Sequence, residues 1–280
     1  LALLGHVCAG GTTSRVMMVT RGAAAPSASA SDELSMARCM ARALAGAMPS
    51  VRIGHPAGKM VVLDVDPSHD VCAAVQSELH TSDDELEVWY GASGERMVRR
   101  YEQVTLSSPT DFKSKLSETG LYIITGGLGA LGLLAAKALV AHGATRLVLL
   151  SRSGRVSSNS QGLEQELAWL QDQPHVDVQL RRCDVSDEAS VVEMLDSVRA
   201  QGAIEGIVHS AGVLRDPLLR GRDDAEGAEE VWRSKARSAR LLHEHTLQDK
   251  LRLFLTFSSI AAAYGNHGQA AYSASNAFLD

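Results

Sequence analysis

The sequence predicts an α/β protein built on a Rossmann-like, doubly wound parallel sheet, and three adjacent features carry this prediction. Residues 121–124, Leu-Tyr-Ile-Ile, form an apolar run that is typical of a buried strand. The pattern Gly127-x-Gly129-x-x-Gly132 follows, and residues 133–142 then have the apolar composition of a helix. Strand, glycine turn and helix make up the first half of a βαβ unit that binds a dinucleotide.

The glycine turn is the strongest functional signal in the chain. Its spacing permits a tight turn, a close approach of the backbone to a pyrophosphate, and close packing of the helix on the strand. The helix N-terminus offers N–H groups and the positive end of its dipole to phosphates. A flexible glycine loop can imitate this pattern, but the flanking strand and helix favour a cofactor site. The residues predicted to bind there are Thr125, Gly126, Gly127, Leu128, Gly129, Leu131 and Gly132.

The rest of this half alternates between strands and helices. Apolar runs and helical spacing predict strands over residues 146–150, 176–180, 204–209 and 252–258, and helices over 163–171 and 228–246. Ser186 is predicted to cap a further helix, and Tyr272 lies at the predicted start of the last one.

The first half repeats the alternation without a phosphate loop. Its predicted strands span 16–20, 61–65 and 86–90, the last as an edge strand, and its predicted helices span 32–48 and 69–79. We therefore expect a second, degenerate Rossmann-like subdomain with a structural role at residues 1–106. Residues 107–120 are the predicted linker, and residues 121–280 the predicted catalytic subdomain. Because the chain lacks an initial Met and stops inside a predicted helix, we expect a piece of a longer protein, truncated at its C-terminus.

Composition narrows the classes of partner. The 280 residues are 45% hydrophobic and carry a net charge of −6 with no basic cluster, which argues against nucleic acid or an anionic membrane surface. No apolar run approaches the roughly 20 residues of a membrane helix. The four cysteines are scattered without metal spacing, so we predict no metal site and a reducing, cytoplasmic location, or an organelle stroma if a targeting segment exists.

The strand ends predict how a cofactor is held. Ser151 and Arg152 follow the second strand where folds that prefer NAD usually carry an acid, which favours the 2′-phosphate of NADPH over a surface arginine without a role. Asp184 and Val185 follow the third strand, where the carboxylate holds either the adenine edge or only its own turn. The small residues Ser210, Ala211 and Gly212 follow the fourth strand and leave room for the nicotinamide ribose.

One charged residue interrupts a predicted apolar helix face. Lys235 shares a stripe with Val231, Ala239 and Leu242 at helical spacing. A lysine in such a stripe is costly unless it reaches solvent or has a partner. Taken alone, reaching solvent is the better interpretation.

Several motifs together resemble a known family. Residues 121–280 are similar to the ketoreductase domain of polyketide synthases and animal-type fatty acid synthases, within the short-chain dehydrogenase/reductase superfamily. The matching segments are TGGLGALG (125–132), LVLLSRSG (147–154), CDVSD (183–187), HSAGVLRD (209–216), Lys235 and FSSIAAAYGNHGQAAYSASNAFLD (257–280). In the first half, VMMVTRGA (16–23) resembles the family's structural subdomain.

The resemblance implies a catalytic set. Tyr272, Ser259 thirteen residues before it and Lys235 thirty-seven before it fit the family's pattern, as does Asn276 four residues after the tyrosine. Simpler superfamily members place the lysine and asparagine the other way round. The implied roles are proton donation by Tyr272, binding of the carbonyl oxygen by Ser259 and Tyr272, easing of the tyrosine's deprotonation by Lys235, and water ordering by Asn276.

The implied reaction is NADPH-dependent reduction of a β-ketoacyl thioester to the β-hydroxyacyl thioester. The implied partners are an acyl carrier protein with its phosphopantetheine-linked substrate and the other synthase domains. Asp216 in the triplet Leu-Arg-Asp, and Tyr264 where members of the opposite type often carry Trp, favour the D (B-type) alcohol. The alternatives are a catalytically silent structural domain and a stand-alone reductase of another carbonyl compound.

Overall fold

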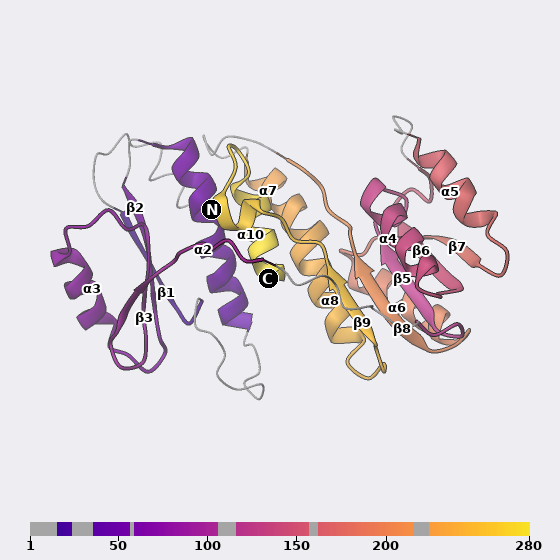
Figure 1. Ribbon diagram of the computed structural model, residues 1–280, viewed down its shortest axis with the longest axis horizontal. Helices are drawn as coiled ribbons and strands as arrows, with labels where there is room; N and C mark the ends of the chain where they lie inside the picture. Colours follow the sequence, from indigo (N-terminus) through magenta and orange to yellow (C-terminus); the bar gives the residue numbers. More distant parts are fainter. Residues whose placement is uncertain (1–15, 24–35, 57–58, 106–115, 157–161, 216–223) are drawn as a thin grey trace. The chain divides into compact units, whose positions relative to one another are not determined.

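The computed structural model describes residues 16–23, 36–56, 59–105, 116–156, 162–215 and 224–280. The chain divides into two compact units, and Figure 1 labels most of their helices and strands. The first unit holds residues 1–105, 214–232 and 258–280, and the second holds residues 106–213 and 233–257.

The second unit contains the predicted doubly wound sheet. Its strands are β5 (Leu121–Thr125), β6 (Arg146–Ser151), β7 (Asp177–Arg182), β8 (Ile204–His209) and β9 (Leu253–Thr256). All pairings are parallel, and the spatial order is β7-β6-β5-β8-β9. Because the order reverses beside β5, this is the doubly wound arrangement, with its switch point between β5 and β8. The predicted fold class is confirmed.

Helices cover both faces of this sheet, as the alternation of buried side chains requires. Tyr122 and Ile124 of β5 pack in a cluster with α4 (Ala130–Ala141) and α5 (Leu163–Gln171). The neighbouring residues Leu121 and Ile123 point the other way, into a cluster with α6 (Glu188–Arg199) and α8 (Ser238–His245). Fully buried strands of this kind are typical of parallel sheets with helices on both sides.

The first unit holds the second, smaller sheet. Its strands are β1 (Val16–Arg21), β2 (Met60–Val65), β3 (Glu87–Tyr90) and β4 (Arg96–Val98), in that spatial order. β1, β2 and β3 are parallel, which agrees with the predicted βαβ repeat. The prediction that 86–90 forms an edge strand is wrong, because the antiparallel β4 pairs with β3 and forms the edge. A three-residue strand is too short for its alternation to be recognised in the sequence.

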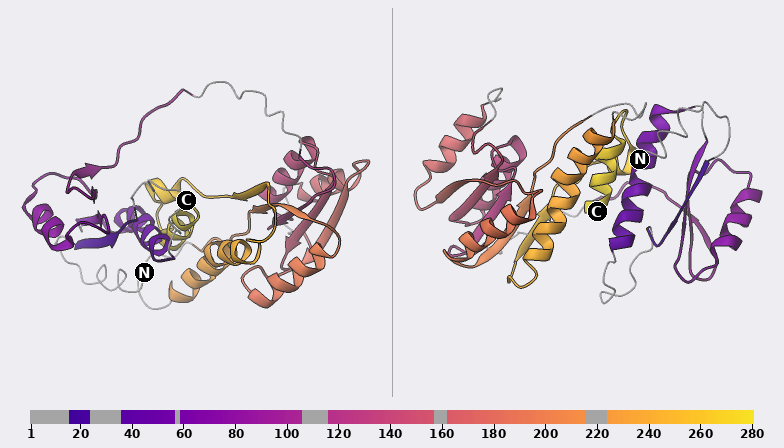
Figure 2. Two further views of the ribbon diagram at one scale, coloured as in Figure 1. Left: turned by 90° about the horizontal axis from the view of Figure 1, so that it is seen from below. Right: turned by 180° about the vertical axis from the view of Figure 1, so that it is seen from behind.

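Each face of the smaller sheet packs against its own helix. α2 (Met36–Gly54) contributes Met48 and Val51 to a cluster with β1 and β2, whereas α3 (Val71–His80) packs on the opposite face through Ala74. α10 (Ala270–Leu279) lies beside α2 in every view of Figure 1 and Figure 2. α7 (Asp224–Trp232) and the short α9 (Ala261–Tyr264) also contact α10.

The compact units differ from the predicted division in one respect. Residues 214–232 and 258–280 fall within the predicted catalytic half, but they group with the first unit. The reason is apolar contact: Ala274, Phe278 and Trp232 pack with Ala43 and Ala47 of α2. The predicted boundaries of the subdomains stay a prediction.

Two details of the predicted helices are corrected. The helix expected over 228–246 is divided into α7, a π-helical turn at Arg233–Arg237 and α8. The cap of α6 is Asp187, whose carboxylate accepts from the Ser190 N–H, and not Ser186. Among the described helices, none has both the length and the apolar character that crossing a membrane requires.

Candidate active site

The turn after β5 has no room for side chains at three of its glycines. A Cβ on Gly127 would lie 2.8 Å from the Ile124 carbonyl oxygen and from the Leu149 Cβ, and one on Gly132 would lie 2.3 Å from the Gly126 oxygen. Gly126 itself has a φ of +61°, in the left-handed region that favours glycine. The sequence pattern therefore matches a physical requirement at each of these positions.

Gly129 differs from these three, because its missing side chain leaves a cradle that faces away from the protein. It is the N-cap residue of α4, and a Cβ there would approach only the Gly126 oxygen, at 3.3 Å. No side chain caps α4, so its first turn is open to an anion. Leu128 is buried beside it, whereas Leu131 is exposed on the outer side. The cradle fits the pyrophosphate of a dinucleotide.

The switch point brings the glycine turn against the segment after β8. The Ala211 N–H donates to Thr125 Oγ1 at 3.2 Å, and Ser210 Oγ donates to the Thr125 carbonyl at 2.6 Å. A Cβ on Gly126 would lie 2.9 Å from the Ala211 backbone. Ser210, Ala211 and Gly212 are thus close to the predicted pyrophosphate cradle, in the crevice where doubly wound folds bind ligands.

The ends of β6 and β7 carry the residues predicted to select the cofactor. Ser151 Oγ accepts from the Gly154 N–H at 2.8 Å, and Arg152 is exposed. Asp184 Oδ1 accepts from both the N–H and the hydroxyl of Ser186, so the turn role left open by the sequence is present. Burial opposes ionisation of Asp184, but the Ser186 hydrogen bonds and the charge of Arg152 hold its pKa below the usual range. Val185 is buried.

Lys235 lies in the π-helical turn of the second unit and does not reach solvent. The residue is 5% exposed, and its Nζ donates to the Phe257 carbonyl at 2.8 Å. A Cβ on Gly212 would lie 3.8 Å from that nitrogen. The ammonium group is therefore held inside the unit, next to the segment after β8, which favours a functional role over the interpretation as a solvent-seeking lysine.

Ser259, Tyr272 and Asn276 belong to the first unit. Ser259 Oγ accepts from the Ala261 N–H at 3.2 Å at the start of α9. Tyr272 is partly buried on α10, and Asn276, one turn later, donates from Nδ2 to the Tyr272 carbonyl at 2.8 Å. Asn276 is fully buried, and its Oδ1 has no hydrogen-bond partner among the described residues. A buried acceptor of this kind is suited to an ordered water.

Of the two residues predicted to bear on product stereochemistry, one lies among the described residues. Tyr264 is 53% exposed at the end of α9 and stacks on Tyr101, with ring centroids 4.5 Å apart. Asp216 lies outside the described residues.

His209 is a site residue that the sequence reasoning missed. It is the last residue of β8 and is completely buried, with Nδ1 2.7 Å from Thr125 Oγ1 and Nε2 2.9 Å from the Lys235 carbonyl oxygen. Burial lowers its pKa to about 4, so the ring is neutral at neutral pH. A histidine that ends an otherwise apolar strand was the available signal, because buried polar groups need partners.

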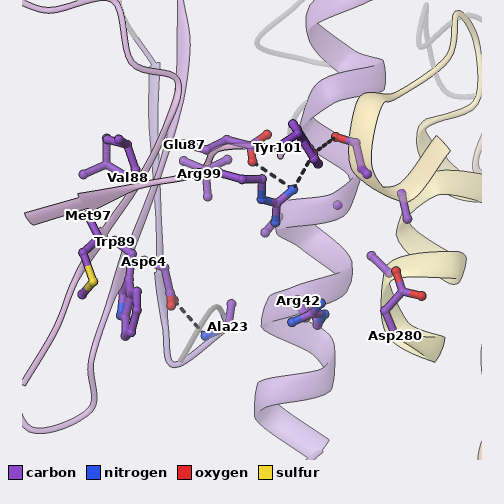
Figure 3. Close-up of a pocket in the computed structure, with 17 residues that line it drawn as sticks. Ala23, Arg42, Asp64, Glu87, Val88, Trp89, Met97, Arg99, Tyr101 and Asp280 are labelled. Atoms are coloured by element: carbon purple, nitrogen blue, oxygen red, sulfur yellow. Dashed lines mark hydrogen bonds and ion pairs between the residues drawn. The ribbon is translucent and has the colours of Figure 1, made fainter. Parts of the chain in front are cut away.

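A separate cavity of about 430 Å³ lies in the first unit, between the smaller sheet, α2 and the C-terminal helices. Figure 3 shows Val88, Trp89 and Met97 of the sheet on one side of it. Three of the charged groups that line it are engaged with protein: Arg99 pairs with Glu87 at 3.1 Å, and Asp64 accepts from the Ala23 N–H. It lacks a glycine turn and is distinct from the predicted dinucleotide site.

Comparison with protein families and curated proteins gives consistent matches. The family model described as KR domain matches residues 120–280. The highly reducing polyketide synthase dmxL2 of Cryptosporiopsis sp. is 38% identical over 180 residues, which is 64% of this chain and 7% of that protein. A phenolphthiocerol/phthiocerol polyketide synthase of Mycobacterium tuberculosis is 32% identical over 248 residues, 86% of this chain and 13% of that protein.

Solved structures agree with these matches. A structure of A-type ketoreductases from a modular polyketide synthase superposes with a TM-score of 0.81 at 29% identity, covering 99% of this chain and 57% of that one. The first ketoreductase of the tylosin polyketide synthase gives a TM-score of 0.77 at 28% identity, covering 99% and 57%.

Proposed function

This chain belongs to the KR domain family, the ketoreductase domains of polyketide synthases within the short-chain dehydrogenase/reductase superfamily, and we propose that it reduces a β-ketoacyl thioester to the β-hydroxyacyl thioester. The observation that carries the proposal is the buried Lys235, held beside the predicted cofactor crevice in a chain that also has Ser259, Tyr272 and Asn276 at the family's spacing.

The proposed cofactor is NADPH, which supplies the hydride when it is bound. The glycine turn and the open N-terminus of α4 support binding of the pyrophosphate. Arg152 after β6, with Ser151 beside it, supports the 2′-phosphate, because a guanidinium binds phosphate oxygens in a bidentate manner. Asp184 and Val185 are proposed for the adenine, and Ser210, Ala211 and Gly212 for the nicotinamide ribose.

The protein residues have complementary roles in the proposed reaction. The hydroxyls of Ser259 and Tyr272 bind the carbonyl oxygen as negative charge develops on it, and Tyr272 donates the proton. An unperturbed phenol titrates near pH ~10, so a cation beside it is needed to ease its deprotonation, and Lys235 supplies that charge. Asn276 binds a water through its unsatisfied Oδ1, which resupplies the proton.

The proposed context is a multidomain synthase. The chain spans 7 to 13% of the length of the curated relatives named above, and these are polyketide synthases. An acyl carrier protein would present the substrate on phosphopantetheine, and other synthase domains would act before and after this one. The described cysteines are free thiols, which suits the proposed cytoplasmic location.

Product stereochemistry is proposed from two residues only. Asp216 favours the D (B-type) alcohol, and Tyr264 replaces the tryptophan of the opposite type. The similar solved structures include ketoreductases described as A-type and as C2-type, so likeness of fold does not separate the classes.

The decisive experiment follows the absorbance of NADPH with a β-ketoacyl pantetheine thioester, in the full natural chain that contains this sequence. We expect turnover with NADPH, weaker turnover with NADH, and loss of about 10²- to 10⁴-fold in the Tyr272→Phe variant, because a positioned acid contributes that much. NADPH binding, followed by its fluorescence, remains in the variant.

Other outcomes would redirect the assignment. Binding of NADPH without reduction of any β-ketoacyl thioester would favour a silent structural domain or a reductase of another carbonyl compound. Failure to bind NADPH at all would contradict the roles given to the glycine turn and Arg152.

A further inference from the structure

A buried hydrogen-bond chain connects the cofactor turn to the backbone that carries Lys235. Its members are Thr125 at the end of β5, His209 at the end of β8 and Ser238 at the start of α8, and all three side chains are fully buried. All of them lie in the second unit. None belongs to the family's catalytic set described above.

The donors and acceptors in this chain can be assigned. Because a carbonyl oxygen can only accept, His209 Nε2 carries the proton and donates to the Lys235 carbonyl at 2.9 Å. The ring is neutral, so Nδ1 is an acceptor and takes the Thr125 hydroxyl proton at 2.7 Å. Thr125 Oγ1 also accepts from the Ala211 N–H.

The acceptor of the histidine lies in the irregular part of the helix. Lys235 is the middle residue of the π-helical turn Arg233–Arg237, and its carbonyl also lies 3.1 Å from Ser238 Oγ. Single π-turns inside helices occur frequently at functional sites, where they change the direction of a side chain. Ser234 Oγ, from the same turn, accepts from the Val213 N–H just after the Ser-Ala-Gly segment.

We infer that His209 is a positioning residue: its Nε2–H fixes the π-helical turn and so places the Lys235 ammonium for the proposed reduction. The inference rests on the proposed function and adds a residue to it. Without the imidazole, the Lys235 carbonyl loses a buried donor, and the turn can relax toward a regular helix, in which the lysine side chain is rotated. The same chain connects this turn to Thr125 and hence to the cofactor turn.

Two substitutions test the two ring nitrogens of His209 separately. In His209→Asn, the amide oxygen matches Nδ1 and can still accept from Thr125, but the shorter side chain no longer donates to the Lys235 carbonyl. In His209→Gln, the amide nitrogen matches Nε2 and restores that donor. The control is Thr246→Val, which removes a buried hydroxyl bond to the Leu242 carbonyl in α8 without touching the π-helical turn.

The variants are made in the full natural chain and assayed with NADPH and a β-ketoacyl pantetheine thioester. We expect His209→Asn to lower kcat about 10- to 100-fold, because small misplacements of a catalytic group cost that much. The affinity for NADPH should stay within about threefold of that of the natural protein. This is less than the tenfold change that corresponds to about 1.4 kcal/mol of binding free energy. His209→Gln recovers most of the turnover, and Thr246→Val keeps it.

The contrast between the two substitutions gives a readout that loss of folded protein would not move. Both variants lose the imidazole, but only His209→Gln keeps a donor for the Lys235 carbonyl. Turnover per folded protein should therefore recover in His209→Gln and not in His209→Asn.

Failure of the inference can be distinguished from failure of the proposed function by the Lys235→Met variant. If Lys235→Met keeps its turnover, the role proposed for the lysine is wrong. If Lys235→Met is inactive while His209→Asn matches the natural protein in kcat, the positioning role of His209 is overturned and the proposed function stands.

Discussion

At the glycine turn after β5, the space open to a side chain differs between neighbouring positions. A Cβ on Gly127 would meet backbone and side-chain atoms of the protein at 2.8 Å. A Cβ on Gly129 would have one neighbour, at 3.3 Å, and otherwise faces the predicted pyrophosphate. The fold therefore requires the glycine at position 127, whereas the proposed ligand requires the glycine at position 129.

This contrast predicts opposite phenotypes for two alanine variants. Gly127→Ala should lower the free energy of unfolding by about 1–3 kcal/mol, because it overpacks the turn. Gly129→Ala should leave stability within about 0.5 kcal/mol but weaken NADPH binding at least about tenfold. Chemical denaturation and NADPH fluorescence measure the two effects. Normal NADPH binding by Gly129→Ala would place the pyrophosphate elsewhere.

The environment of the Lys235 side chain could be predicted only in part from the sequence. Its place in an apolar stripe is visible there, and the stripe residues Val231, Ala239 and Leu242 are indeed buried. Local spacing favours a solvent-seeking side chain, and only the family resemblance points inward. The partner of its Nζ, the Phe257 carbonyl, lies 22 residues away in the chain, beyond the reach of any local pattern.

At the scale of the elements, a glycine allows helices α2 and α10 of the first unit to pack closely. A Cβ on Gly46 would lie 2.2 Å from the Cβ of Ala277. Nearby, Ser50 Oγ and Ser273 Oγ are hydrogen-bonded at 2.7 Å and are buried. Small residues thus allow α10, which carries Tyr272 and Asn276, to pack directly on α2.

We predict that Gly46→Ala destabilises the first unit by about 1–3 kcal/mol through overpacking. This outweighs the gain of up to about 1 kcal/mol in helix propensity. Gly54→Ala is the matched control at the end of the same helix, since a Cβ there meets nothing within 4 Å. Adding Ala277→Gly to Gly46→Ala should restore stability in denaturant unfolding. If it does not, the two helices are not in contact at this position.

The π-helical turn is the element that sequence periodicity could not predict. An apolar stripe at spacings of three and four fits one continuous helix, and it predicts that helix over 228–246. The turn at Arg233–Arg237 instead depends on groups from β8 and from the segment after it. Those partners become neighbours only when the sheet forms.

At the scale of the whole molecule, the buried histidine couples stability to pH. Burial lowers the pKa of His209 to about 4, with the charge of Lys235 acting in the same direction. In the unfolded chain its pKa is about 6.5. Between these values the unfolded state binds more protons, so stability is complete above pH ~6.5 and falls as pH decreases toward 4.

The expected loss between pH 7.5 and pH 5 is about 2 kcal/mol for the second unit. Denaturant unfolding at the two pH values measures it, and His209→Gln, which cannot titrate, is the comparison. The difference in the free energy of unfolding between the natural protein and His209→Gln should become smaller as pH falls. Parallel pH profiles would mean that the histidine is not held neutral in the folded state.

The sequence alone determined the strand–turn–helix of the cofactor site, most strand and helix positions, and the family with its expected catalytic set. These depend on contiguous patterns of apolar residues, glycines and fixed spacings, which exist before the chain folds. Only the tertiary structure revealed the edge strand β4, the packing of α10 on α2 and the buried contacts of His209. Thr125 and Lys235 lie 84 and 26 residues from that histidine, and only the parallel sheet brings the three together.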